Sequence, residues 1–161
     1  MNPFINIKKF SGWDIITISL YFALTIFLYL ANFPSKVDWL FGYTLGTHLF
    51  LYFFNYKSLR NFAVWLIWLG FSFIHLYLYF QFVDLPELQI FGTSTANGLR
   101  FTWILLFVYQ VLRFLSLKIR NLELVSLSRG KKDIWDKRNI TFFDVTLFFV
   151  YIIIMMILNF I

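Results

Sequence analysis

Apolar residues occur along this chain in five long runs, which short polar segments separate. A helix that crosses a bilayer needs roughly 20 mostly apolar residues, with a range of about 17–25. Five segments meet this requirement: residues 13–32, 39–55, 62–82, 99–117 and 142–161. The pattern predicts an all-α integral membrane protein, in which five transmembrane helices form a bundle and residues 1–161 form a single membrane domain.

The polar interruptions carry turn and charge signals. Pro34 ends the first run, because proline disfavours helix in the residue that precedes it. A continuous helix through the second and third runs would bury Lys57 and Arg60 in the bilayer, where charged side chains are costly. We therefore expect these two runs to be separate helices.

The basic residues predict an orientation, since short cytoplasmic loops carry an excess of Lys and Arg. With the N-terminus in the cytoplasm, the inner segments hold twelve of them: Lys8, Lys9, Lys57, Arg60, Arg113, Lys118, Arg120, Arg129, Lys131, Lys132, Lys137 and Arg138. The outer segments hold only Lys36 and Arg100. We expect a cytoplasmic N-terminus, a C-terminus outside, and a basic cytoplasmic loop at residues 118–140 that attracts anionic lipid. Acidic residues dilute the charge of this loop, so we expect no nucleic-acid binding.

The composition agrees with a membrane protein. Hydrophobic residues make up 60% of the 161 residues and charged residues 14%, whereas an ordinary soluble domain has about 25% charged residues. The chain has no cysteine, which excludes disulfides, thiolate catalysis and iron–sulfur clusters. Its heavy use of Phe, Ile, Leu, Asn and Lys is typical of an AT-rich bacterial genome, and we expect a multi-pass protein of a bacterial inner membrane.

Two runs begin with the same local motif. Ser11 and Asp14 precede or open the first run, and Thr141 and Asp144 do so for the fifth. Each pair places a hydroxyl at a helix N-cap and a carboxylate three residues later, which approximates a capping box with Asp in place of Glu. We interpret both pairs as helix caps at the membrane surface; a pair of proton-carrying carboxylates is the alternative.

Polar residues inside the predicted spans fall on single helix faces. The first four spans each carry such a face: Thr17, Tyr21, Thr25 and Tyr29; Thr44, His48, Tyr52 and Asn55; Trp68, Ser72, His75 and Tyr79; Gln110 and Arg113. The fifth span has few polar residues and is expected to be the most exposed to lipid or to a partner. Interhelical hydrogen bonds of about 0.6 kcal/mol each explain these faces. The alternative is a hydrated pocket lined by His48, His75, Gln110 and Arg113.

The second span contains Gly42 and Gly46, four residues apart. This small-residue spacing lets another helix approach closely, so we expect the two glycines to form a helix-packing surface. His48 lies on a different face of the same helix.

A haem or a metal at the two histidines is not predicted. By their positions along the predicted spans, His48 and His75 differ in depth by about 10 Å, and no other good ligand accompanies them. Arg113 lies near the cytoplasmic end of its span, where we expect its side chain to extend to the headgroups. The alternative is an inward fork to an anionic group such as Asp144.

The sequence contains no recognised catalytic motif, and it reveals no reaction. We therefore expect a non-enzymatic subunit of a larger inner-membrane complex, which acts through lateral helix packing with other membrane protein subunits. A small transporter or channel component with a polar pocket among the first four spans is one alternative. An intramembrane lipid-modifying enzyme is the second.

Overall fold

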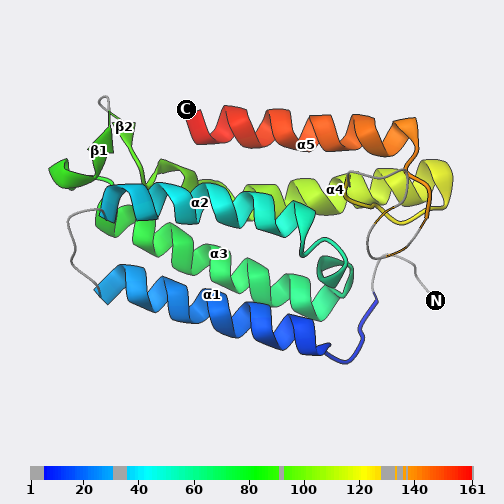
Figure 1. The fold of residues 1–161 in the computed structure, drawn as a ribbon, viewed down its shortest axis with the longest axis horizontal. Coiled ribbons are helices and arrows are strands. Elements are labelled where there is room, and N and C mark those ends of the chain that lie inside the picture. The colour runs from blue at the N-terminus through cyan, green and yellow to red at the C-terminus, as the bar shows by residue number, and fades with distance from the viewer. Residues whose placement is uncertain are drawn as a thin grey trace.

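The computed structural model describes residues 6–30, 36–90, 93–127, 133, 136 and 138–160. Its five long helices are α1 (Gly12–Leu30), α2 (Lys36–Phe53), α3 (Phe62–Phe82), α4 (Thr102–Arg120) and α5 (Phe142–Phe160). The helices contact one another along the bundle and alternate in direction, so that α1, α3 and α5 begin at one end and α2 and α4 at the other (Figure 1). Each predicted run corresponds to one of these helices.

Short elements connect the long helices. They are η1 (Ser58–Arg60), η2 (Pro86–Leu88), β1 (Gln89–Ile90), β2 (Thr93–Ser94) and η3 (Asn97–Phe101). The two strands pair antiparallel, with Gln89 opposite Ser94. This small hairpin lies between α3 and η3 at the end of the bundle where α2 begins (Figure 1), and the sequence did not predict it.

Four of the helical segments are long and apolar enough to cross a membrane, namely α1, α3, η3 with α4, and α5. The protein is therefore a multi-pass membrane protein in contact with the lipid bilayer. Helix α2 is not among the four. It begins at Lys36 rather than at the predicted residue 39, and it carries Asp38 and His48 among its 18 residues.

The helix bounds follow local signals in the sequence. Helix α3 spans the predicted residues 62–82. Helix α4 begins later than predicted because η3 precedes it, and it continues to Arg120, where Asn121 ends it in a left-handed conformation with φ 53°. The predicted residues 31–32 and 161 lie outside the described residues, as does part of the basic loop, including Arg129, Lys131, Lys132 and Lys137.

The described basic residues gather at one end of the bundle. Eight lie where α1, α3 and α5 begin or where α2 and α4 end: Lys8, Lys9, Lys57, Arg60, Arg113, Lys118, Arg120 and Arg138. Lys36 and Arg100 lie at the opposite end. We call the first the basic end.

The polar faces of the helices point into the bundle, as predicted. Thr17, Tyr21 and Thr25 of α1 are buried, whereas Tyr29 is 46% exposed. The polar residues predicted for α2 are all buried. The fifth helix has the lowest buried fraction of the four candidate spans, as expected, but it shares this value of 22% with α1.

Candidate functional site

Side chains from all five helices join in one chain of hydrogen bonds. Its members are Thr25 of α1, Tyr43 and His48 of α2, His75 of α3, Thr102 of α4 and Asn159 of α5. The Tyr43 hydroxyl lies 2.6 Å from the Thr25 hydroxyl and 2.7 Å from His75 Nε2. The Thr102 hydroxyl lies 3.1 Å from His75 Nδ1 and 3.2 Å from His48 Nε2. His48 Nδ1 lies 3.1 Å from the Asn159 amide nitrogen. We call this set the histidine chain.

The direction of hydrogen bonding follows from the two ends of the histidine chain. At one end the Asn159 amide nitrogen donates to the Met155 carbonyl at 2.7 Å, which identifies it as the donor to His48 Nδ1 as well. A neutral imidazole carries one proton. The proton of His48 therefore lies on Nε2, which donates to the Thr102 hydroxyl.

At the other end the Thr25 hydroxyl donates to the Tyr21 carbonyl at 2.7 Å. Tyr43 must then donate to Thr25, and His75 Nε2 must donate to Tyr43. His75 Nδ1 is then the acceptor from Thr102, whose hydroxyl proton is shared with the more distant Leu99 carbonyl at 3.3 Å. Donors and acceptors thus match from Asn159 to Thr25 with both histidines neutral.

The histidine chain runs across the bundle rather than along it. Five of its six members lie within seven residues of the helix ends opposite the basic end, and His48 is the exception. Both histidines are 0% exposed. Such an arrangement ties the five helices together, and it gives no path from one membrane face to the other.

The histidines meet more closely than the sequence predicted. His48 lies nearer the basic end of its helix than His75 does, but both rings hydrogen-bond to the same Thr102 hydroxyl, so the offset between the two residues does not keep their rings apart. All four imidazole nitrogens are engaged in hydrogen bonds, which leaves none to bind a metal in this conformation. Among the described residues no group of three His, Cys, Asp or Glu side chains could hold a metal ion.

Gln110 and Arg113 do not share a pocket with the histidines. The Gln110 amide donates to the Leu59 carbonyl at 3.1 Å, near the basic end. Neither of the two cavities described below is lined by His48, His75, Gln110 or Arg113. The four residues predicted to line one site therefore belong to two separate regions.

Arg113 forms a buried, two-bonded ion pair. Its Nε and Nη2 atoms each donate to Glu123 at 2.8 Å, and the residue is only 2% exposed. The expectation that it extends to the headgroups is wrong. The inward fork is present, but its partner is Glu123 instead of Asp144. The turn at Asn121 brings Glu123 back beneath the end of α4.

Other charged side chains at the basic end also form ion pairs and hydrogen bonds. Arg60 binds Asp136 at 2.6 Å and lies 3.7 Å from Glu123. Tyr56 donates to Asp133 at 2.6 Å. Burial, together with this hydrogen-bonded carboxylate, raises the pKa of the Tyr56 phenol above its ordinary value, so the phenol stays protonated as the donor.

Both predicted capping boxes are present. Asp14 Oδ2 accepts from the Ser11 backbone N–H at 2.7 Å and from the Ser11 hydroxyl at 2.8 Å, and that hydroxyl accepts from the Asp14 N–H. Asp144 Oδ2 accepts from the Thr141 N–H at 2.9 Å and from the Thr141 hydroxyl at 2.7 Å in the same way.

The boxes differ in their remaining carboxylate oxygen. Asp144 Oδ1 receives Arg138 Nη2 at 2.6 Å, while Nη1 of the same guanidinium reaches Oδ2 at 3.0 Å. Asp14 Oδ1 has no hydrogen-bond partner in the described part of the chain, although Asp14 is only 4% exposed. The buried carboxylate of Asp144 is thus paired with a cation, whereas one oxygen of Asp14 has no hydrogen-bond donor among the described residues.

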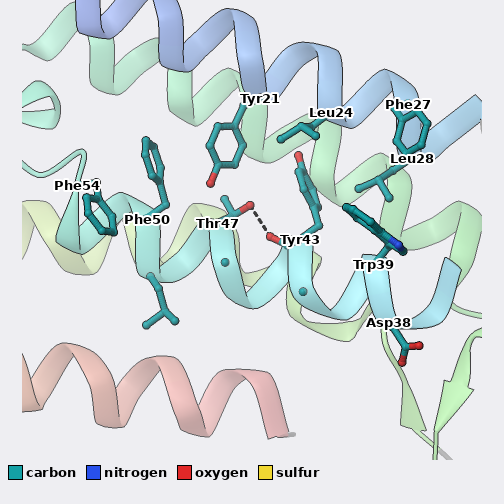
Figure 2. Close-up of a pocket in the computed structure, with 13 residues that line it drawn as sticks. Tyr21, Leu24, Phe27, Leu28, Asp38, Trp39, Tyr43, Thr47, Phe50 and Phe54 are labelled. Atoms are coloured by element: carbon teal, nitrogen blue, oxygen red, sulfur yellow. Dashed lines mark hydrogen bonds between the residues drawn. The ribbon is translucent and has the colours of Figure 1, made fainter. Parts of the chain in front are cut away.

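The predicted glycine surface faces outward. A Cβ added at Gly42 or Gly46 would meet no atom within 4 Å among the described residues, so neither glycine packs against a helix of this chain. They line an open groove of about 670 Å³ between α1 and α2. Figure 2 shows Tyr21 and Leu24 of α1 and Tyr43 and Phe50 of α2 along this groove, where the Thr47 hydroxyl donates to the Tyr43 carbonyl. We call it the α1–α2 groove.

A different glycine is closely packed. A Cβ at Gly98 in η3 would collide with the side chains of Asn159 and Thr44. Gly98 therefore lets η3 approach both α5 and α2, next to the Asn159 end of the histidine chain. Nothing in the sequence around Gly98 indicates what it contacts, so its close packing could not be predicted.

No protein-family model, no curated protein and no solved structure matches this chain. The sequence did not indicate that Tyr43, Thr102 and Asn159 belong to the histidine chain, or that Glu123 and Arg138 form ion pairs. A polar residue at a helix end was the only signal for Thr102 and Asn159, and such residues are common.

Proposed function

We propose that this protein is a non-enzymatic subunit of a larger assembly in a bacterial inner membrane, and that its α1–α2 groove receives a transmembrane helix of a partner protein. The observation that carries the proposal is the open space at Gly42 and Gly46. Small residues four apart promote close helix contact in lipid, where packing rather than hydrophobicity drives association. The chain supplies this surface, and none of the described residues occupies it.

The shape of the groove favours a helix as its occupant. The two glycines lie one helical turn apart on α2, so they offer a strip of bare backbone along the helix axis. Aromatic side chains of both helices, such as Tyr21 and Phe50, border this strip. A second helix that lies on the strip would gain van der Waals contact on three sides.

The chemistry of the remaining groups supports an interaction role over a catalytic one. Arg113, Arg60 and Arg138, whose side chains are 2%, 13% and 19% exposed, are each paired with a carboxylate. The two histidines are sealed from solvent and bonded at every nitrogen. These groups stabilise the bundle, and neither the transporter nor the lipid-enzyme alternative gains a specific observation in its favour.

The proposal includes α2 as a fifth span, with the N-terminus in the cytoplasm and the C-terminus outside. Helix α2 runs parallel to the bundle and alternates in direction with its neighbours (Figure 1). Its 18 residues extend over about 27 Å, close to the thickness of a bilayer core. Its polar residues Thr44, Thr47 and His48 are buried, which explains how a helix of low hydropathy could cross the membrane.

The partner interaction is tested by paired glycine substitutions. Gly46→Leu should remove stoichiometric copurification of the partner in mild detergent while the chain itself remains folded, because the added side chain fills open space. Gly70→Leu is the matched control, since Gly70 also has open space at Cβ but lies on α3 outside the groove. Purification of the wild-type chain alone, or equal effects of the two substitutions, would contradict the proposal.

The topology has its own test. A reporter that is active only in the cytoplasm should give signal when fused after residue 130 and none when fused after residue 161. Signal after residue 161 with none after residue 130 would mean that α2 does not cross the membrane, and signal at both positions would mean that α5 does not cross it.

A further inference from the structure

A second cavity lies at the basic end, beside the start of α1. It has a volume of about 420 Å³ and is open at the surface of the protein. Residues from the segment before α1, from the first turn of α1 and from the α2–α3 turn line it, and those used below are Lys8, Lys9, Trp13, Asp14, Phe54 and Lys57. The volume falls within the range of about 300–1,000 Å³ that is typical of small-ligand sites.

The cavity is held in place by Asn61, the N-cap of α3. The Asn61 side chain accepts from the Lys8 backbone N–H at 3.2 Å and donates to the Lys8 carbonyl at 2.9 Å. The Phe62 N–H donates to the Asn6 carbonyl at 2.9 Å. The segment that carries Lys8 and Lys9 is therefore fixed against the start of α3, and the site exists before any ligand binds.

The charges in this cavity are of both signs and are incompletely paired. In the described part of the chain the ammonium groups of Lys8 and Lys9 have no carboxylate within ion-pair distance, and Lys57 lies 3.5 Å from Asp136. Asp14 Oδ1 is buried and lacks a hydrogen-bond donor. An unsatisfied buried carboxylate oxygen is costly. A ligand that complements the cavity would carry an anionic group for the lysines and a cationic donor for Asp14.

The second capping box indicates what kind of donor is missing. At α5 the equivalent oxygen, Asp144 Oδ1, is bound by the guanidinium of Arg138. Among the described residues no cation reaches the corresponding oxygen of Asp14, although Lys8, Lys9, Lys57 and Arg60 line the same cavity. A ligand that brings a hydrogen-bonding cation to Asp14 would complete the first box in the same way.

We propose that this cavity binds the headgroup of a phospholipid with a primary ammonium, of the phosphoethanolamine type. The phosphate lies between Lys8 and Lys9, and the ammonium donates to Asp14 Oδ1. Trp13 and Phe54, which are partly exposed, flank the headgroup at the membrane surface, where aromatic rings are favoured.

The site lies next to the α1–α2 groove, because Phe54 lines both cavities. The Phe50 and Phe54 rings are stacked, with 6.2 Å between their centroids, and the centroid of the Trp13 ring lies 6.5 Å from that of Phe50. A lipid held there would border any helix in the groove. The headgroup interaction itself does not depend on a partner protein, so it can fail or succeed independently of the proposed function.

The test is native mass spectrometry of the purified full chain in mild detergent, with phosphatidylethanolamine, phosphatidylglycerol and phosphatidylcholine of identical acyl chains. Phosphatidylethanolamine should bind about tenfold more tightly than the other two, which is the scale of one hydrogen bond between charged groups. Phosphatidylglycerol lacks the ammonium, and phosphatidylcholine has a cation that cannot donate a hydrogen bond.

Two variants and one control locate the interaction. Asp14→Asn keeps a cap acceptor for Ser11 and replaces the open oxygen with an amide, so the tenfold preference should disappear. Asp38→Asn, in the first turn of α2 at the opposite end, should leave the preference intact. Replacing both Lys8 and Lys9 with Gln should weaken binding of phosphatidylethanolamine and phosphatidylglycerol alike.

Equal binding of the three lipids to the wild-type chain would overturn the proposal, as would an unchanged preference in Asp14→Asn. Stronger binding of phosphatidylglycerol would also overturn it, because a basic patch alone would then account for the site. If Asp14→Asn does not fold, the double lysine variant decides. Lys8 and Lys9 are exposed, so their replacement should not affect folding, and unchanged phosphatidylethanolamine binding in this variant would contradict the proposed site.

Discussion

The first and the fifth helix begin with the same capping box, but only the box of α5 is completed by the chain. There Arg138 binds the carboxylate of Asp144 through two hydrogen bonds, whereas Oδ1 of Asp14 in α1 is left without a donor in the described residues. The same contrast occurs among the glycines. Gly98 is covered by Asn159 of α5, while Gly42 lies open beside α1. On the α4–α5 side the chain itself completes these contacts, whereas on the α1–α2 side the described residues leave them open, although α1 and α5 bury the same fraction of their spans.

This difference separates residues that stabilise the fold from residues available for binding. A buried charge that is paired within the chain contributes to the stability of the monomer, and removal of its partner is costly. An open carboxylate or an open glycine contributes little until a ligand or another helix reaches it. The contrast predicts large stability effects on the α4–α5 side and small ones on the α1–α2 side.

The largest effect is expected for Arg138→Ala. It leaves the buried carboxylate of Asp144 without its cation, and the free energy of unfolding should fall by about 3 kcal/mol. Denaturant unfolding in mild detergent measures this change. Arg120→Ala, which removes an exposed cation at the end of α4, is the control and should change the stability by less than about 0.5 kcal/mol. Similar losses in the two variants would mean that the α5 box is not a special point of stability.

Gly98→Ala should destabilise the chain by about 2 kcal/mol. The added methyl group collides with Asn159 and Thr44, so either η3 or α5 has to move. Gly70→Ala introduces the same group into open space and should be neutral or slightly stabilising, since alanine favours helix over glycine. Thermal unfolding of the two variants side by side measures the difference, and equal melting temperatures would contradict the close packing at η3.

Arg113→Lys should cost about 1.5 kcal/mol, because an ammonium cannot reproduce the two parallel hydrogen bonds to Glu123. The loss is moderate, since the Glu123 side chain is 33% exposed and water compensates part of it. The same unfolding assay applies. An unchanged free energy of unfolding in this variant would contradict the paired fork, and would indicate that Arg113 extends to the headgroups instead.

Asp14→Asn should have the smallest effect, within about 1 kcal/mol. Asparagine retains an acceptor for Ser11 and loses the favourable interaction of a charge with the helix N-terminus. Asp144→Asn, its counterpart in α5, should cost several times more because it also breaks the pair with Arg138. Equal losses at the two positions would remove the distinction between the closed and the open box.

Features set by neighbouring residues could be predicted from the sequence. The apolar runs gave the five helices, and the spacing from Ser11 to Asp14 and from Thr141 to Asp144 gave both caps, because these interactions reach no further than one helical turn. The inward polar face of α2 followed from helical periodicity in the same way. The glycine spacing identified a packing surface, but it carried no information on whether the chain itself fills that surface.

Features that depend on how the helices meet could not be predicted. His48 and His75 share the hydroxyl of Thr102 only because η3 carries the start of α4 deep between their helices. Glu123 reaches Arg113 because Asn121 adopts a left-handed conformation and reverses the chain. Periodicity within one segment gives neither the relative depth of two helices nor the path of a loop.

The most direct test of the open side is site-specific photo-cross-linking in native membranes. A photoreactive amino acid at position 46 should give one discrete protein adduct, larger than the 19.4 kDa chain, and mass spectrometry should identify a membrane protein cross-linked through a transmembrane helix. The adduct should be absent when the photoreactive residue is placed at position 70, and it should disappear when Gly42→Leu fills the groove. Adducts with lipid alone at position 46, or the same protein adduct from both positions, would contradict the account.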